Sequence, residues 1–491
     1  MSIITEYRFD ENFELLGHWF LPEGGINNSI TGKLIHDCDG FKDDFFLELY
    51  GDFDEISGRT IIVENKLSEK INIIGFTSDG KTVVIENAIK IYGTLVSNGF
   101  PTSKFLVGRC LVINSLIDIN SYKIAKFITD KGIDNIELSS CEFNFTRLKS
   151  WIGDINTKKD IGDESASISV ALSEDSNDKF YILNKNICLE KILKCDIISN
   201  SIRGEYYWKM ASIDGSCLNV RQFIDLIKSF KNLIQFFVGQ QIGYSYIKLK
   251  TNLEGRSDHL VNCYIVTRQF ITFSKFSDNY ITLKYTDIKD QFNEILNNWY
   301  LKEDKFINIT ENYLSNINSF YYSHSTLLNS IRSLEMFHRN FYIEDDAFED
   351  TQINKLKEEI KDFIRSKSND DKVVSRFCSN IDYDPEKTLS RRIKDLIQNM
   401  DEKMKQNFIK KAEKNMSKSI DSFVYKIVST RNFYTHGDRS NINEKVITDS
   451  RDIINYSHLL DQILKYYIYK QLFEINDYVI DKIINGWIKV I

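Results

Sequence analysis

"SIDSFVYKIVSTRNFYTHGD", residues 419 to 438, carries the clearest structural signal in the chain. Apolar side chains recur in this stretch at spacings of three and four, the period of one face of an α-helix. They are Ile420, Phe423, Val424, Ile427 and Val428. The next positions on the same face are Arg431 and Asn432. A guanidinium that faces a core or a partner is costly unless it is paired, so the stretch predicts a helix that ends in functional side chains.

His436 and Gly437 follow at the end of this predicted helix. Arg431 and His436 are five residues apart, about 140° around an ideal helix, so they do not aim at one atom while the helix is unbroken. Gly437 is expected to end the helix in the left-handed conformation. Such a break would turn His436 toward the Arg431 side or toward a second protomer.

Outward from this helix the chain changes character twice. Up to about residue 215, short apolar runs such as FFLELYGDF alternate with turn dipeptides, which is typical of antiparallel strands and hairpins. A helical pattern appears at 219–239, and strand-like sequence then resumes. After about residue 300 helical periodicity dominates. The sequence therefore predicts an α+β multidomain protein, with a β-rich region at 1–300 that holds an embedded helix and an all-α bundle at 301–491.

Composition sets the general class. The chain has 491 residues, of which 42% are hydrophobic and 27% charged, and its mean hydropathy is -0.31. These values describe a soluble globular protein that is long enough for more than one core. The net charge of -7 argues against a uniformly basic nucleic-acid binder, although a local basic patch stays compatible with it.

Cysteines and the N-terminus indicate a cytoplasmic protein. The 8 cysteines are scattered and form no CxxC pair or zinc-like cluster, so we expect reduced thiols, no metal site and no cofactor. The first residues lack the layout of a signal peptide. No apolar run approaches the roughly 20 residues of a bilayer-spanning helix, so no membrane partner is expected.

GFTSDGKT, residues 75–82, matches the pattern of a phosphate-binding loop. That loop needs a helix after it, because the helix N-terminus holds the phosphates. Here a β-branched run, Val83 to Ile85, follows and favours a strand. We therefore predict a hairpin turned at Asp79-Gly80 and set nucleotide hydrolysis aside.

Arg431-Asn432-x-x-x-His436 resembles the R-x(4–6)-H signature of HEPN domains. The layout of the whole chain resembles the ApeA-like HEPN proteins of bacterial anti-phage defence, in which a β-rich N-terminal domain precedes the helical one. SLEMFHRNFY, residues 333–342, resembles the glutamate-bearing early helix of that domain. Two further arginine–histidine pairs fit the loose spacing, Arg332 with His338 and Arg451 with His458. Both lie within continuous helical patterns, and we interpret the two histidines as satisfied residues on helix surfaces.

The resemblance implies a metal-independent RNA endonuclease of the abortive-infection type, which is a toxin to its own infected cell. RNA supplies its own nucleophile, the 2′-hydroxyl, so the protein has only to orient it, move protons and offset phosphorane charge. Histidine suits the proton transfer and arginine the phosphate oxygens. Two motifs that face each other across a homodimer would supply an acid and a base. A phage-derived trigger protein is a further partner compatible with the resemblance.

Two supporting groups complete the predicted site. Glu335 lies on an apolar stripe, and our hypothesis is that it pairs with Arg431; otherwise it is a residue at the edge of the apolar face. A basic run between the predicted helices includes Lys410, Lys411 and Lys414. It is either a solvated helical face or a contact surface for RNA phosphates.

The main alternative is a catalytically silent module. In that case the helical half dimerises and keeps the motif by ancestry, while the β-rich half recognises a phage protein or another ligand. The intact Arg431, Asn432 and His436 favour the ribonuclease.

Overall fold

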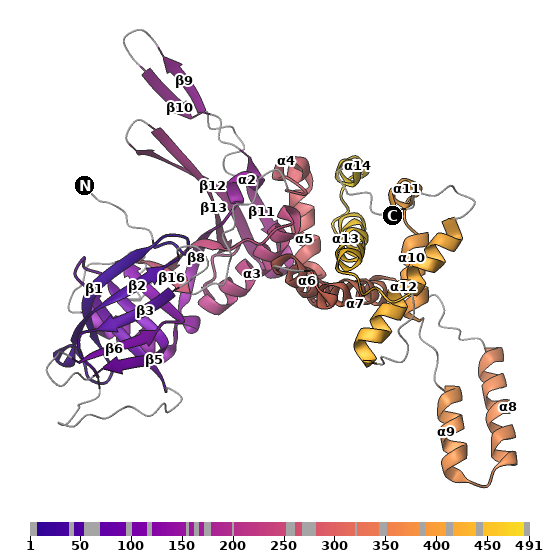
Figure 1. The fold of residues 1–491 in the computed structure, drawn as a ribbon. Helices are drawn as coiled ribbons and strands as arrows, with labels where there is room; N and C mark the ends of the chain where they lie inside the picture. Colours follow the sequence, from indigo (N-terminus) through magenta and orange to yellow (C-terminus); the bar gives the residue numbers. More distant parts are fainter. Residues whose placement is uncertain are drawn as a thin grey trace. The chain divides into compact units, whose positions relative to one another are not determined.

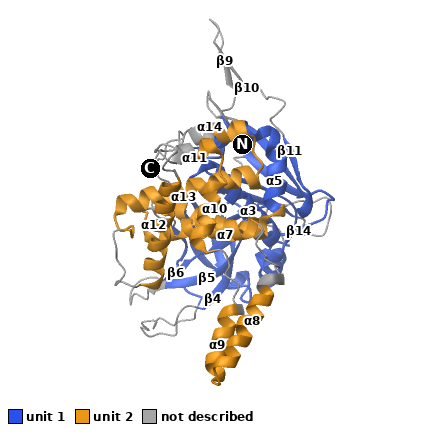
Figure 2. Cartoon of the chain, turned by 90° about the vertical axis from the view of Figure 1, so that its right-hand side faces the viewer, with its two compact units in different colours: residues 1–300 blue, residues 301–491 orange. Residues whose placement is uncertain are grey.

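The protein consists of two compact units, Met1–Tyr300 and Leu301–Ile491 (Figure 2). The structure is a computed structural model. It describes residues 7–38, 44–53, 69–94, 101–114, 120–153, 157–161, 166–170, 178–198, 201–251, 261–267, 281–319, 322–342, 351–382, 388–408, 416–437 and 445–485. Each unit is considered by itself below.

A six-stranded antiparallel barrel forms the first part of unit 1 (Figure 1). Its strands are β1 Phe13–Phe20, β2 Ile30–Asp37, β3 Asp44–Leu49, β4 Lys70–Thr77, β5 Thr82–Thr94 and β6 Thr102–Leu106. They pair in the order β5-β4-β1-β2-β3-β6, and β6 pairs with β5 again, which closes the ring. Alternate side chains point inward and are buried, as a half-buried strand requires.

The hairpin between β4 and β5 contains the stretch that matches a phosphate-binding loop. Phe76 pairs with Thr82, and Gly80 takes the left-handed conformation with φ of 80°. The amide of Thr77 donates to the carbonyl of Lys81 at 2.9 Å, which closes the turn. The predicted hairpin at Asp79-Gly80 is therefore confirmed, and a strand stands where nucleotide binding requires a helix.

The same sheet continues beyond the barrel from the long strand β5, which also pairs with β7, Arg109–Asn114, and this continuation is called the second sheet below. The order continues β7-β16-β15-β8-β13-β12-β11. Its further strands are β8 Glu137–Phe145, β11 Lys179–Ile182, β12 Ile187–Ile198, β13 Ser201–Ser212, β15 Tyr244–Thr251 and β16 Val261–Thr267, and the short β14, Leu218–Asn219, pairs with β8. A separate hairpin joins β9, Thr157–Ile161, to β10, Ala166–Val170.

The embedded helix is α3, Val220–Val238, close to the predicted 219–239. Asn219 and Gln222 form a reciprocal capping box at its start, and Gly239 ends it in the left-handed conformation. Its Phe230 contacts the rings of Phe143 and Trp208. Two helices were not predicted, α1, Ser121–Lys131, and the short α2, Leu148–Ile152. The buried residues of α1 are Ser121, Ala125 and Ile128, and because two of them are small, they do not mark an apolar face in the sequence.

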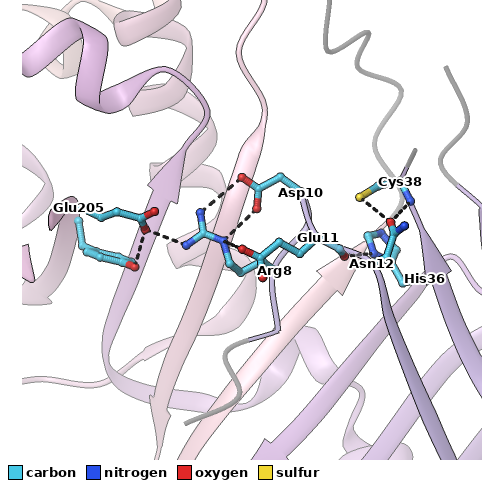
Figure 3. A network of polar contacts seen from close by, with 8 residues as sticks. Arg8, Asp10, Glu11, Asn12, His36, Cys38 and Glu205 are labelled. Carbon is cyan, nitrogen blue, oxygen red and sulfur yellow. Dashed lines mark hydrogen bonds and ion pairs between the residues drawn. The ribbon is translucent and has the colours of Figure 1, made fainter. Parts of the chain in front are cut away.

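A polar network joins the segment before the barrel to the second sheet (Figure 3). The Arg8 guanidinium lies between Asp10, whose Oδ1 is 3.0 Å from Nε, and Glu205 of β13, whose Oε2 is 2.9 Å from Nη1. Tyr207 donates a further hydrogen bond to Glu205. Burial alone would lower the pKa of Arg8, but the two carboxylates raise it above its usual value. Arg8 therefore stays charged and links the segment before the barrel to strand β13 within unit 1.

Two helices end unit 1. They are α4, Tyr285–Ile288, and α5, Phe292–Leu301. The Trp299 indole donates to Ser229 Oγ at 2.9 Å and the Tyr300 hydroxyl to the carbonyl of Leu226 at 2.9 Å. Because both acceptors belong to α3, α5 packs with the β-rich unit although its sequence is helical.

The regular elements described in unit 2 are all helices (Figure 1). Its helices are α6 Glu303–Asn318, α7 His324–Phe341, α8 Thr351–Lys367, α9 Asp371–Asp382, α10 Leu389–Gln398, α11 Glu402–Phe408, α12 Met416–His436, α13 Ser450–Tyr467 and α14 Asp477–Asn485, and a π-helical turn, Ile468–Leu472, follows α13. The helix α7 is central, because α6, α10, α12 and α13 all pack against it. The predicted α+β class, β-rich and then all-α, is confirmed.

Candidate functional site

The helix α12, Met416–His436, carries the arginine–histidine motif. Ile420, Val424 and Ile427 are at most 6% exposed, whereas the other two residues of the predicted stripe are half-buried. The buried face continues at Thr430, which is fully buried, so Arg431 lies at the edge of that face and is half-buried. Arg431, which was expected to continue the stripe, is half-buried like Phe423 and Val428, whereas Asn432 is exposed.

Thr430 is buried because its polar atoms are satisfied locally. Its hydroxyl donates to the carbonyl of Lys426 at 2.7 Å and accepts the amide of Ile447 at 2.9 Å. The carbonyl of Ile447 in turn accepts the Tyr434 hydroxyl at 3.3 Å. The segment before α13 therefore holds the last turns of α12 from one side, and it fixes the helix that carries the motif.

The helix ends at Gly437, as predicted. Gly437 has φ of 65°, and its amide donates to the carbonyl of Phe433 at 2.9 Å. The break nevertheless falls after His436 and not before it. His436 therefore keeps its helical position, about 140° from Arg431, and the two side chains do not converge on one atom within a single chain.

Arg431 and Asn432 are adjacent and linked. The Arg431 Nη1 donates to Asn432 Oδ1 at 3.2 Å, and among the described residues the guanidinium has no carboxylate partner. Asn432 and His436 are exposed. A guanidinium that is held by a neutral amide keeps its charge available for an anionic ligand.

His324 is a residue that sequence reasoning missed. It is exposed at the first turn of α7, and its ring stacks on Tyr434, with centroids 4.4 Å apart and planes 10° from parallel. Tyr434 belongs to the motif segment, so a second histidine lies beside it. The two residues are 110 positions apart, and no local sequence signal links them.

The expected ion pair between Glu335 and Arg431 is absent from the described residues. Glu335 pairs instead with Arg339, at 3.1 Å between Oε1 and Nη2. The two residues are four positions apart on α7, so they face each other on one side of that helix. The Glu335 carboxylate therefore has Arg339 of its own helix as its ion-pair partner.

His338, in one of the two rival motifs, is buried and not on the surface. Its Nδ1 is 3.3 Å from Nη1 of the buried Arg392, and its Nε2 is 3.4 Å from Asp395 Oδ2. A guanidinium only donates, so Nδ1 accepts the hydrogen bond from Arg392. Its motif arginine, Arg332, is exposed and takes no part. This histidine is a buried structural residue between α7 and α10.

His458, in the other rival motif, is half-buried against Tyr322. The tyrosine hydroxyl lies 3.2 Å from His458 Nδ1, and the ring centroids are 4.5 Å apart. Burial lowers the pKa of His458, and Lys465 adds to this effect. The prediction of a satisfied histidine holds, but a tyrosine covers part of it.

A buried polar cluster joins α6, α7 and α13. The Ser330 hydroxyl donates to Asp461 Oδ1 at 2.7 Å and accepts from Asn316 Nδ2 at 2.9 Å. Burial raises the pKa of Asp461 to about 7, and the hydrogen bond from Ser330 and the charge of Lys465 oppose this shift. Burial also lowers the pKa of Lys465. The bundle therefore holds a carboxyl group whose charge changes near neutral pH.

The basic run predicted to contact RNA is described only in part. Lys410, Lys411 and Lys414 lie outside the described residues. Of their neighbours, Lys394 pairs with Asp421 at 2.8 Å and Lys403 with Asp481 at 2.6 Å. These two lysines therefore already have carboxylate partners on other helices, and RNA contact by Lys410, Lys411 and Lys414 stays a prediction.

The described residues also bear on metals and membranes. Within the described ranges, no three histidine, cysteine or carboxylate side chains are grouped to hold a metal ion. None of the described helices is both long enough and apolar enough to cross a bilayer.

A β-barrel unit followed by a helical bundle that bears an R-x(4)-H motif at the end of a helix defines a HEPN-type protein with a β-rich N-terminal part. Residues 14–299 match the family described as ApeA N-terminal domain 1, and residues 328–474 match the family described as Apea-like HEPN. No curated protein and no solved structure gives a significant match. The chain belongs to the ApeA-like HEPN proteins of anti-phage defence.

Proposed function

We propose that unit 2 is a metal-independent RNA endonuclease whose catalytic residues are Arg431, Asn432 and His436. The observation that carries the proposal is the arrangement at the end of α12. A guanidinium that has no carboxylate partner among the described residues lies beside an exposed asparagine, and an exposed histidine follows at the same helix end. These groups suit a phosphodiester, which is anionic and needs proton transfer during cleavage.

Each group has a role in the proposed reaction. The RNA 2′-hydroxyl attacks the adjacent phosphorus and gives its proton to one His436, while the departing 5′-oxygen takes a proton from a second imidazole. The Arg431 fork offsets charge on the non-bridging oxygens, and Asn432 holds that fork. The bond from phosphorus to the 5′-oxygen breaks as the bond to the 2′-oxygen forms, so no external reactant is needed.

A homodimer supplies the second imidazole in this proposal. His436 stays on the helix about 140° from Arg431, so one chain does not present an acid and a base to opposite sides of one phosphorus. Two copies related by a two-fold axis bring two motifs together. Lys410, Lys411 and Lys414 would then bind RNA phosphates, with an affinity that falls as salt rises.

Unit 1 has the sensing or restraining role in this proposal. The enzyme would act in an infected cell, in the cytoplasm, with a phage-derived protein as the trigger that releases it. Cleavage that ends growth of the infected cell is what makes the protein a toxin in an abortive infection.

The first test is incubation of the purified protein with bulk cellular RNA in EDTA. We expect the wild type to cleave, and the His436→Ala variant to lose nearly all cleavage because it lacks the proton-transfer group. His18→Ala is the matched control, since His18 is an exposed histidine of unit 1, and it should cleave like the wild type. Equal cleavage by the wild type and His436→Ala would overturn the proposed site. No cleavage by any of them, with or without a phage lysate as trigger, would favour the silent binding module.

A further inference from the structure

The helices α8 and α9 form a hairpin within unit 2 (Figure 2). Only residues 368–370 join them, so they run antiparallel, and they pack against each other. Asp370 caps α9, since its Oδ1 accepts the amide of Lys372 at 2.9 Å. The hairpin is therefore a defined two-helix element.

The contact between the two helices leaves large apolar side chains outside. Ile364 on α8 and Val374 on α9 are half-buried, and Lys361 is 7% exposed. Five large apolar side chains remain in solvent: Leu356 at 55% exposed, Ile360 at 41%, Phe363 at 62%, Val373 at 41% and Phe377 at 54%. Exposed leucines and phenylalanines are ordinary when single, but grouped ones indicate a contact surface.

The five side chains lie on one face of the hairpin. On α8, the stripe Leu356, Ile360 and Phe363 is turned about 100° from the side that contains Lys361 and Ile364. On α9, Val373 and Phe377 are turned about 90° in the same rotational sense from the side of Val374. Because the helices are antiparallel, these two rotations bring both stripes to the same side.

The size of this apolar face fits an interface with an equal partner. With roughly 150–250 Å² for each large side chain, the exposed fractions amount to on the order of 500 Å² of apolar surface. Two such faces bury on the order of 1,000 Å² when they pack together, about the minimum of a specific protein interface.

The charge of the hairpin favours a second copy over a nucleic acid. Residues 351–382 contain seven lysines and arginines and six aspartates and glutamates, counted along the sequence. Pairs such as Lys361 with Glu358 and Arg365 with Asp362 match charges within the hairpin. A nearly neutral, mixed surface neither attracts a polyanion nor repels its own copy.

We propose that this apolar face is a self-association surface, on which the α8–α9 hairpins of two copies pack as a four-helix bundle. Two antiparallel two-helix faces of this kind complete each other, because each presents apolar stripes that the other covers. The inference stands on the hairpin itself and does not depend on RNA cleavage.

The test is the oligomeric state of the full chain by sedimentation velocity over a range of concentrations. We expect the wild type to dimerise, and the double variant Phe363→Glu/Phe377→Glu to raise the dimer dissociation constant by at least about tenfold, because two buried carboxylates oppose packing. Leu183→Glu/Tyr478→Glu is the matched control, since these residues are 74% and 81% exposed but lie outside the hairpin. The control should dimerise like the wild type.

Photocrosslinking is a second test, which does not depend on the folding of the Phe363→Glu/Phe377→Glu variant. With p-benzoylphenylalanine in place of Phe363, irradiation should give a covalent dimer, whereas the same residue in place of the exposed Arg365 should not. A monomeric wild type, a double variant that dimerises like the wild type, or crosslinks from position 363 only within one chain would each overturn the proposal. None of these readouts uses RNA, so they are independent of the cleavage test.

Discussion

Arg431 and Arg392 show how the surroundings of an arginine decide its use. Arg392 is 1% exposed beside His338, whose other nitrogen faces Asp395, so its charge serves the packing of α7 on α10. Arg431 is half-buried, and among the described residues its guanidinium bonds only to the neutral amide of Asn432. An unmatched charge at the edge of a core binds an anion with little loss of existing contacts.

At the same scale, His324 stacks on Tyr434, and we propose that this contact positions the motif. We expect His324→Ala to lower RNA cleavage several-fold, because loss of the ring contact, about 0.5–1.5 kcal/mol, loosens the last turns of α12. His324→Phe should restore most of the activity, since a phenyl ring stacks without transferring protons. Cleavage rates of the three proteins give the answer. Failure of phenylalanine to rescue a folded protein would instead make His324 a proton-transfer group.

At the scale of elements, α12 is fixed from two sides. The segment that contains Ile447 bonds to Thr430 and Tyr434, and α7 and α10 pack against the buried face. Gly437 then ends the helix where a residue with a side chain is strained. The motif is therefore held on a rigid helix end and not on a free loop, which suits a site that must hold its geometry.

The packing of α6, α7 and α13 around Asp461 makes the stability of unit 2 depend on pH. Burial raises the pKa of this carboxyl to about 7, and in an unfolded chain it is about 3.9. The folded state therefore binds the proton more tightly, and its stabilisation is complete below about pH 4 and is lost as pH rises toward 7. We expect this carboxyl to lower the free energy of unfolding by up to about 1.4 kcal/mol per pH unit as pH rises over this window, which lowers the unfolding temperature.

The Asp461→Asn variant should lose most of this slope, because an amide of the same shape keeps an acceptor for Ser330 and does not ionise. Asp452→Asn, at an exposed position of the same helix α13, is the control and should keep the wild-type slope. Thermal unfolding at several pH values checks this. A slope in Asp461→Asn equal to that of the wild type would contradict the assignment.

At the scale of the whole molecule, the proposed site needs two copies of the chain. We expect a threefold excess of His436→Ala chains, co-expressed with the wild type, to lower cleavage per wild-type chain to about one quarter, because with random pairing only about one wild-type chain in four meets another. The same excess of His18→Ala chains, which are themselves expected to cleave, should leave the cleavage per total chain unchanged. RNA cleavage by the purified mixtures is the measurement, and constant cleavage per wild-type chain would mean that each chain carries a complete site.

Periodicity and turn chemistry determined the architecture. Short-range patterns predicted three features, since each pattern repeats within ten to twenty residues. These features are the strands of unit 1, the helix α3 and the helical second half. The hairpin at Asp79-Gly80 and the helix end at Gly437 are equally local, because a left-handed backbone selects glycine. The motif Arg431, Asn432 and His436 was visible for the same reason, as its residues lie within six positions.

Tertiary structure decided what depends on distant residues. His324 stacks on Tyr434 and His338 contacts Arg392, and each contact joins residues more than fifty positions apart in the sequence. The pKa of Asp461 is raised by the helices that bury it. Glu335 turned to Arg339 and not to Arg431 because a partner one helical turn away was nearer. Sequence spacing fixes which face of its own helix a side chain is on, whereas only the packing of helices decides what that face meets.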